Sequence, residues 1–256
     1  MRMDYDFLKR RIYEVLGIDL NSYKEQQMRR RIDQWLTRYS LEDYAHLVER
    51  IKSDAEHREK FTNYLTINTS QFFRDLGVFN DIENMVLPRI TAGGKRPRIW
   101  SAGASIGAEI YSIALLLKKY NQRAQQLLAT DIDEAILDRA EKGRYSPNEV
   151  QNVPPALIEK YFTNDENHLV LSEEVRTMVT FKKHDMLRDL FPKPFDLILC
   201  RNVFIYFTAE TQERLIHKFV DSLVSGGFFI VGSAEHIMDP ARFGLERQSY
   251  CIYSKL

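Results

Sequence analysis

The stretch RIWSAGASIGAEIYSIALLLKKY, residues 98–120, decides the fold of this chain of 256 residues. Its first five residues, 98–102, are a short apolar run that predicts a buried strand. A loop with Gly103 and Gly107 follows, and residues 109–120 then repeat apolar side chains at helical spacing. A strand, a glycine-containing loop and a helix in this order are typical of an α/β sheet that binds its ligand at the carboxyl ends of the strands.

The same alternation of strands and helices continues to the end of the chain. We predict further strands at residues 126–131, 179–183, 195–202, 228–232 and a pair within 245–253. We predict helices at 133–143 and 208–223, and Gly226 and Gly227 are expected to end the second of these elements. Repeated units of this kind give a parallel, doubly wound sheet, and right-handed crossovers bring the carboxyl ends of its strands to one edge. The segment at about 144–180 interrupts the alternation with prolines and a turn-like TNDENH, so we expect an inserted antiparallel β-subdomain there.

The amino-terminal part predicts a small all-helical domain. Apolar residues recur there at helical spacing, as in Met28, Ile32 and Trp35, and no alternating strand-like run interrupts them. We therefore expect a helical domain at residues 1–75 and a sheet domain at residues 76–256, whose first element is a connecting helix.

Composition excludes several classes of protein. Lys plus Arg and Asp plus Glu number 36 each, so the net charge is zero and no global attraction to nucleic acid is expected. Cys200 and Cys251 lie in apolar runs and are expected to be buried thiols, and the histidines form no pair typical of a metal site, so we expect no metal. A charged amino terminus and the lack of a long apolar run predict a cytoplasmic protein with no membrane insertion.

Polar residues stand where the predicted strands end. Asp131 ends the second strand, where an acid in this architecture accepts hydrogen bonds from ribose hydroxyls, although the following Asp133 makes a helix-initiating role an alternative. Asp185 follows the third strand, and Arg201 and Asn202 leave the fourth. Because the carboxyl ends of parallel strands share one edge, we expect these side chains to face a common ligand.

Other side chains in these motifs have two competing explanations. Glu109, in the first turn of its helix, contacts a cationic ligand or stabilises the helix dipole. Tyr206 reaches the ligand or joins the core. Gly103 and Gly107 allow close approach to a ligand or form a plain tight turn, since the loop is not GxGxxG. These residues together point to an adenosyl ligand, and they leave a methyltransferase and a dehydrogenase both open.

Four motifs in order along the chain resemble those of the chemotaxis receptor methyltransferases, the CheR family: NTSQFFR (68–74), WSAGASIGAEIYSIA (100–114), TDIDEAIL (130–137) and CRNVFIYF (200–207). The resemblance implies a class I S-adenosylmethionine-dependent methyltransferase: a Rossmann-like doubly wound sheet with a small all-helical amino-terminal domain and an inserted antiparallel β-subdomain. It also implies an activity, the transfer of methyl from S-adenosylmethionine to glutamate side chains of chemotaxis receptors, which forms methyl esters and S-adenosylhomocysteine.

The resemblance also assigns roles to single residues. Arg74 and Tyr206 are the implied catalytic residues, with Tyr206 facing the transferable methyl. The segment that contains Asn68, Ser70 and Arg74 would form a lid over the cofactor, anchored by aromatic side chains. The cofactor-binding residues it implies are Asn68, Ser70, Arg74, Ala102, Gly103, Glu109, Asp131, Asp185, Met186, Asn202 and Val203. Gly107 is followed by Ala108, where the family usually has an acid, so one of its two acids is missing here.

The implied partners are the glutamate-rich cytoplasmic helices of membrane chemoreceptors. A glutamate acceptor is ionised at neutral pH and needs no general base, so the enzyme's main task is alignment. We expect a basic band on the second helix to dock these helices, and the alternative is a solvated face with local ion pairs. Its residues are Lys24, Arg29, Arg31 and Arg38. The short turn between Phe162 and Leu169 favours independence from a receptor carboxyl-terminal peptide tether.

The sequence disfavours two other functions. A nucleic-acid methyltransferase is disfavoured by the zero net charge and by the lack of a basic groove with interleaved aromatic side chains. It is also disfavoured because CRNVFIY stands where base-methylating enzymes tend to carry a motif such as NPPY. A non-enzymatic adenosyl-binding module is disfavoured because Arg74 and Tyr206 are kept together with the cofactor positions.

Overall fold

The computed structural model describes residues 4–66 and 70–256 and forms two compact units. One unit comprises Met1–Asn68 and Tyr206–Glu213, and the other comprises Thr69–Ile205 and Arg214–Leu256. Residues 70–75, which the sequence analysis placed with the helical domain, lie in the second unit because Phe72 and Phe73 are buried there.

The first unit is helical, as predicted. Its elements are α1 (Tyr5–Leu16), the 3-10 turn η1 (Leu20–Ser22), α2 (Glu25–Arg38), α3 (Tyr44–Ser53) and α4 (Ala55–Thr66). Helix α1 begins where the Asp4 side chain accepts the Phe7 N–H, and it ends at Gly17 in the left-handed region. Trp35 is fully buried, and its indole N–H donates to His57 Nε2 at 3.2 Å, which joins α2 to α4.

The chain returns to the helical unit after Ile205. Within that unit the Lys24 N–H donates to the Tyr206 carbonyl at 2.8 Å, and the Thr208 N–H donates to the Ser22 carbonyl at 3.0 Å. Helix α12 (Ala209–Ser222) therefore starts in the first unit and continues in the second.

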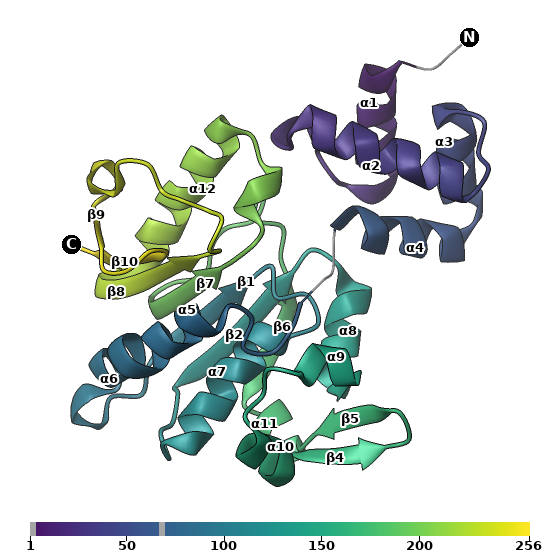
Figure 1. Cartoon of the computed structure of the whole chain (residues 1–256). Coiled ribbons are helices and arrows are strands. Elements are labelled where there is room, and N and C mark those ends of the chain that lie inside the picture. Colours follow the sequence, from purple (N-terminus) through teal and green to yellow (C-terminus); the bar gives the residue numbers. More distant parts are fainter. Residues whose placement is uncertain (1–3, 67–69) are drawn as a thin grey trace. The chain divides into compact units, whose positions relative to one another are not determined.

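The second unit is built on a seven-stranded sheet (Figure 1). Its strands, in spatial order, are β6 (Val179–Lys183), β2 (Gln126–Asp131), β1 (Arg98–Ala102), β7 (Phe195–Cys200), β8 (Leu223–Val231), β10 (Ile252–Lys255) and β9 (Leu245–Arg247). The first five are parallel, and β10 runs antiparallel to both of its neighbours. The predicted doubly wound fold is confirmed, and every residue of β7 is buried, as its continuous apolar run predicts.

Strand β8 differs from the prediction because it begins at Leu223 rather than at Phe228. Gly226 and Gly227 lie inside the strand, with Gly226 in the left-handed region at φ 72°. The pairing of β8 with β7 shifts register between Phe195 and Leu197. The glycine pair therefore makes an irregularity within the strand instead of ending the element before it.

Helices cover both faces of the sheet. Trp100 on β1 packs against Phe219 of α12 on one face, and Ser101 bonds Glu109 of α7 on the other. In Figure 1 the sheet lies between α12 and the group α5, α6 and α7. The remaining elements are α5 (Leu76–Asp81), η2 (Ile82–Val86), α6 (Leu87–Ile90), η3 (Ala92–Gly94), α7 (Ala108–Lys119), α8 (Glu134–Lys142), η4 (Phe204–Tyr206) and η5 (Pro240–Phe243).

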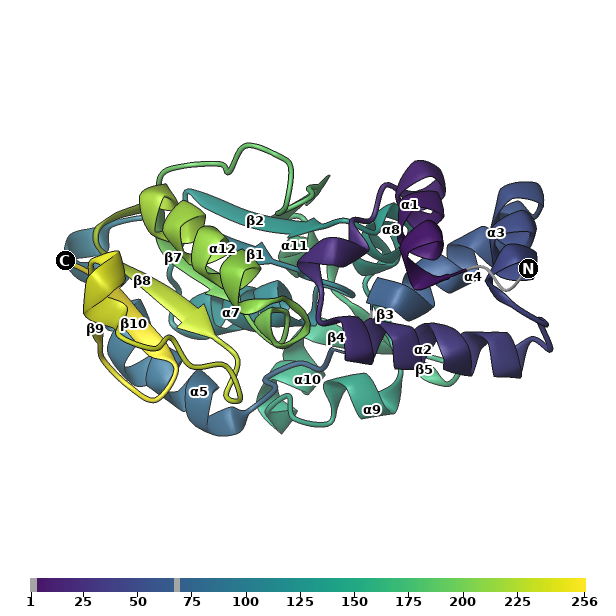
Figure 2. The same cartoon turned by 90° about the horizontal axis from the view of Figure 1, so that it is seen from above.

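The predicted insertion is a small antiparallel subdomain, whose strands β4 and β5 form a hairpin in Figure 1 and whose helices α9 and α10 are labelled in Figure 2. Its three strands lie in the order β3-β5-β4, and its elements are β3 (Arg144–Tyr145), α9 (Pro147–Val150), α10 (Pro155–Tyr161), β4 (Phe162–Asp165), β5 (His168–Leu171) and α11 (Glu173–Arg176). Buried Tyr145 donates its hydroxyl to the Ile106 carbonyl at 2.9 Å, so the subdomain is tied to the glycine loop. Among the described residues, no helix is long and apolar enough to cross a membrane.

Candidate active site

The predicted site residues of the second unit gather where the parallel strands end. Ala102 and Asp131 are the last residues of β1 and β2, and both are buried. Most of the others are half-buried, which is the exposure expected of side chains that line an open site. They are Ser70, Arg74, Gly103, Glu109, Asp185, Met186, Asn202 and Val203. Asn68 lies outside the described residues.

Gly103 is the centre of one cluster. Its φ of 73° lies in the left-handed region, and a Cβ atom placed on it would lie 2.7 Å from Val203 Cγ2 and 3.6 Å from Met186 Cε. The structure therefore brings together three residues from three different loops. A side chain at position 103 would fill the space between them, so glycine is required there for steric as well as conformational reasons.

Asp131 holds the same glycine loop through a hydrogen bond. Its Oδ2 accepts the Ser105 N–H at 2.9 Å, and its Oδ1 accepts the Asp133 N–H at 3.1 Å. Burial raises the pKa of this carboxyl to about 6, and the backbone hydrogen bonds oppose that shift only in part. A carboxylate oxygen has two lone pairs, so both oxygens keep capacity for a further donor.

Arg201 holds the strand end and two other segments together. Its side chain is only 2% exposed, and its Nη2 donates to Asp75 Oδ2 at 2.8 Å and to the Arg74 carbonyl at 3.0 Å. Its Nη1 lies 3.4 Å from Glu109 Oε2, while Glu109 Oε1 accepts the Ser101 hydroxyl at 2.7 Å. The sequence placed Arg201 at this edge but did not show that one guanidinium joins two carboxylates.

Residues 70–75 are anchored to the second unit by two aromatic side chains. Phe72 is fully buried and packs edge-on against Tyr145 at 4.8 Å between ring centroids, and its N–H donates to the Glu149 carbonyl. Phe73 donates its N–H to Ser112 Oγ at 2.9 Å. Phe72 and Phe73 therefore anchor the segment within the second unit. That the segment forms a lid over the cofactor stays a prediction.

The backbone around Arg74 is strained. Phe73 at φ 50° and Asp75 at φ 61° both lie in the left-handed region, which a bulky side chain rarely adopts. Such conformations persist only where the surroundings enforce them, and they concentrate at functional sites. Arg74 is thus presented by a turn that is fixed on both sides.

Glu235 is a residue that the sequence analysis missed. It is buried, its Oε2 accepts the N–H groups of Asn202 at 2.8 Å and Gly232 at 2.6 Å, and its Oε1 accepts that of Ile205 at 3.1 Å. Burial raises the pKa of this carboxyl. Asn202 itself lies at φ 60°, so Glu235 stabilises the unusual turn that presents it. The sequence signal that could have identified Glu235 is its position just after β8, because the carboxyl ends of the parallel strands share one edge.

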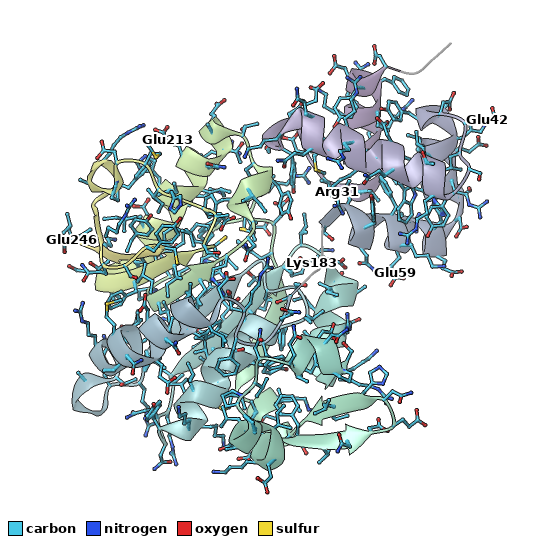
Figure 3. The ribbon with its side chains drawn as sticks, in the orientation of Figure 1. Arg31, Glu42, Glu59, Lys183, Glu213 and Glu246 are labelled. Carbon is cyan, nitrogen blue, oxygen red and sulfur yellow. The ribbon has the colours of Figure 1, made fainter. Side chains whose placement is uncertain are left out.

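The remaining predicted residues lie in the first unit. Tyr206 ends η4, and its carbonyl bonds Lys24 there. Of the basic band, Lys24, Arg29 and Arg38 are exposed. Arg31, labelled in Figure 3, is half-buried. It donates to the Tyr64 carbonyl of α4 and lies 4.5 Å from the Tyr64 ring centroid.

Across residues 4–66 and 70–256, no three His, Cys, Asp or Glu side chains are grouped so that they could hold a metal ion.

Comparison with known proteins gives matches along nearly the whole chain. The family model described as CheR methyltransferase, SAM binding domain, matches residues 68–251, and that of the CheR methyltransferase all-alpha domain matches residues 3–66. A chemotaxis protein methyltransferase of Listeria innocua is 35% identical over 257 residues, covering 100% of this chain and 98% of the relative. Its counterpart in Escherichia coli K12 is 32% identical over 256 residues, covering 95% and 88% respectively.

Proposed function

Because the chain belongs to the CheR family of methyltransferases, we propose that it transfers the methyl group of S-adenosylmethionine to glutamate side chains of chemotaxis receptors. The observation that carries this proposal is the match of both family domains in order, together with the gathering of the predicted cofactor residues at one edge of the sheet. The products would be a glutamate methyl ester and S-adenosylhomocysteine, and the protein would act in the cytoplasm.

The residues present fit such a cofactor. Met186 and Val203 both lie against Gly103, and we propose that these three residues form an apolar wall beside the adenosyl group. Asp131 keeps acceptor capacity for ribose hydroxyls. Glu109 is half-buried at the same edge, where its carboxylate already pairs with Arg201, and we propose that it also contacts the cofactor. When bound, the cofactor supplies an electrophilic methyl on a positively charged sulfur.

The chain's own contribution to the reaction is alignment. A glutamate carboxylate, with an ordinary pKa of about 4.3, is already a nucleophile at neutral pH. Because the bound cofactor would supply the methyl together with its leaving group and the acceptor is already ionised, the chain's residues would need to move no proton. We propose that Arg74 orients the acceptor carboxylate or the cofactor carboxylate, and that Tyr206 faces the methyl group. Holding reactants in line is worth several kcal/mol, on the order of 7–11 in favourable cases.

The test of this function is the chemistry of the product. The protein is incubated with methyl-labelled S-adenosylmethionine and receptor-containing membranes from which carboxyl-terminal tether peptides are absent, and the membranes are then treated with mild base. Release of the label as methanol is expected, because methyl esters are base-labile and N-methyl groups are not. Label that resists base, or label found on nucleic acid, would favour a nucleic-acid methyltransferase. Absence of transfer despite cofactor binding would favour a binding module.

Cofactor binding is expected to weaken at acid pH because of Asp131. With its pKa near 6, the carboxylate form falls to roughly one part in ten at pH 5, so affinity that depends on it falls by up to about tenfold. Calorimetric titration with S-adenosylhomocysteine between pH 5 and pH 8 measures this. Asp131→Asn should bind weakly with no such pH dependence, and an equally pH-dependent Asp131→Asn protein would contradict the assignment.

Lowering the pH is expected to weaken cofactor binding through Asp131, but to raise the contribution of Asp131 to the free energy of unfolding. The folded carboxyl takes up its proton near pH 6, and the ordinary value is 3.8, so between these values the folded state binds more protons than the unfolded state. The contribution of Asp131 to the free energy of unfolding therefore rises as the pH falls from 7 towards 4. Weaker binding at pH 5 would not be caused by unfolding through this group.

We also propose that the exposed basic residues of α2 dock the acidic receptor helices. Arg38→Glu is expected to lower kcat/KM for receptor methylation by roughly three- to tenfold, more strongly at low salt, with unchanged affinity for S-adenosylhomocysteine. Arg38 is the better probe than Arg31, since Arg31 also bonds Tyr64 and its loss would disturb the helical unit. The matched control is Lys52→Glu, which makes the same change of charge at an exposed residue of α3. Equal effects of both variants would refute a specific docking face.

A further inference from the structure

Lys218 of α12 reaches the loop that connects β6 to β7. Its Nζ donates to the Met186 carbonyl at 3.1 Å and to the Asp189 carbonyl at 3.5 Å. It also lies 4.8 Å from the ring centroid of Phe191. Lys218 therefore contacts three residues of one loop, and two of them, Met186 and Asp189, belong to the same turn as Asp185.

That loop has little regular structure of its own. Residues 184–194 contain neither helix nor strand. Its first turn is closed from within, because Asp185 Oδ1 accepts the Leu187 N–H at 2.8 Å and Asp189 Oδ2 accepts the Asp185 N–H at 2.8 Å. These bonds set the shape of the turn, but they do not attach it to the sheet or to the helices.

The loop is attached to the rest of the unit at several points. At its start the His184 N–H donates to the Asp131 carbonyl of β2 at 2.9 Å, and the His184 ring packs edge-on against Trp100 at 5.6 Å. Phe191 packs edge-on against Trp100 at 5.2 Å and against Phe219 at 4.8 Å between ring centroids. Lys218 supplies polar attachments on the Asp185 side of the loop. The contacts of His184 and Phe191 therefore hold the two ends of the loop, whereas Lys218 holds the turn of Met186 and Asp189 between them, which contains a predicted cofactor residue.

The ammonium group of Lys218 is partly buried and needs hydrogen-bond acceptors around it. Burial lowers the pKa of its ammonium group, while the carboxylates of Asp185 and Asp189 act in the opposite direction. A partly dehydrated cation is stable only where acceptors replace its lost water. The two loop carbonyls accept hydrogen bonds from the ammonium and so replace part of the water that it loses.

We propose that Lys218 is a positioning residue for the cofactor, which holds the Met186 carbonyl and so keeps Asp185 and Met186 in place beside the adenine. The inference rests on the proposed function, in which these two residues flank the adenine. Met186 Cε also stands 3.6 Å from the position of a Cβ on Gly103, so a shift of Met186 would remove its contact with the glycine loop. Lys218 itself acts through the loop and not on the reacting atoms.

The test compares cofactor affinity with turnover. Lys218→Met keeps the aliphatic stem and removes the charge, and it is expected to weaken S-adenosylhomocysteine binding by roughly three- to tenfold in calorimetry. The KM for S-adenosylmethionine should rise by the same factor, with kcat at saturation unchanged. Lys218→Arg, which keeps a cation with several donors, should restore most of the affinity.

Lys255→Met is the matched control. Lys255 Nζ donates to the Val220 and Leu223 carbonyls at 2.8 and 2.9 Å, so it makes the same kind of bond at the end of α12 without touching the loop. Its loss is expected to lower the melting temperature and leave cofactor affinity unchanged. If Lys218→Met binds as tightly as wild type, or if Lys255→Met weakens binding equally, the inference is overturned. A wild-type protein that binds no S-adenosylhomocysteine would overturn the proposed function itself.

Discussion

Arg74→Ala is expected to lower kcat/KM for receptor methylation by about 10²- to 10³-fold, the range observed when one preorganised hydrogen-bond donor is removed from a catalytic site. The melting temperature should change little, because the Arg74 side chain is half-buried and the segment is anchored by its neighbours. Radiolabel transfer with the purified protein, together with a thermal melt, measures both quantities.

The reason for so large an effect is the way in which the chain presents Arg74. Phe72 and Phe73 are buried on one side of it, and Asp75 bonds Arg201 and the Ser233 hydroxyl on the other. Phe73 and Asp75 both hold left-handed backbone conformations, which cost on the order of 1–3 kcal/mol each. A turn that is strained and yet fixed on both sides favours one placement of Arg74, as an alignment role requires.

Two further variants make the Arg74 result interpretable. Arg74→Lys keeps the charge but lacks the planar fork, so an intermediate loss is expected if the guanidinium aligns a carboxylate through two bonds. Gln71→Ala alters the same segment at a side chain that bonds the Asn148 carbonyl at 3.3 Å, and near wild-type activity is expected. Full activity in Arg74→Ala would refute the catalytic assignment and the lid prediction together.

Arg201→Met is expected to be the most destabilising single change at this site, at about 2–4 kcal/mol. The variant leaves the Asp75 and Glu109 carboxylates without the cation that lies between them. Removing one partner of a buried ion pair costs more than the pair contributes, because the remaining charge stays desolvated. The lower part of the range reflects the side chain of Asp75, which is 34% exposed and partly hydrated.

Urea unfolding of Arg201→Met measures this loss, and a second substitution identifies its cause. Glu109→Gln in the Arg201→Met background removes one of the two stranded charges and should recover part of the lost stability. The same double variant should not recover activity, since Glu109 is also a proposed cofactor contact. A double variant less stable than Arg201→Met alone would contradict the account of an unpaired carboxylate.

Several parts of the fold were predictable because their signals are local. The strands at residues 98–102, 126–131 and 179–183 have the predicted bounds. The apolar run and the polar residues that end it lie next to each other in the chain, so the pattern alone locates them. Strand β8 was misjudged because a glycine pair usually ends an element, and here a register shift against β7 accommodates it.

The contacts within the site were not predictable in the same way. Arg201 meets Asp75 and Glu109 across 126 and 92 positions of the sequence, and Glu235 meets Asn202 across 33. No periodicity or spacing relates residues so far apart. Resemblance to a family named Arg74, Asp131 and Asn202, but it did not name the side chains that hold them in position.

The sequence by itself therefore determined which residues end the strands and which motifs the family shares. These properties depend on the order of residues over one strand or one helical turn. Only the tertiary structure decided that one guanidinium serves two carboxylates, that Glu235 stabilises the turn at Asn202, and that Lys218 holds the loop at Met186. Those pairings arise because parallel strands with crossover helices bring distant loops to one edge, where burial makes each unpaired charge costly.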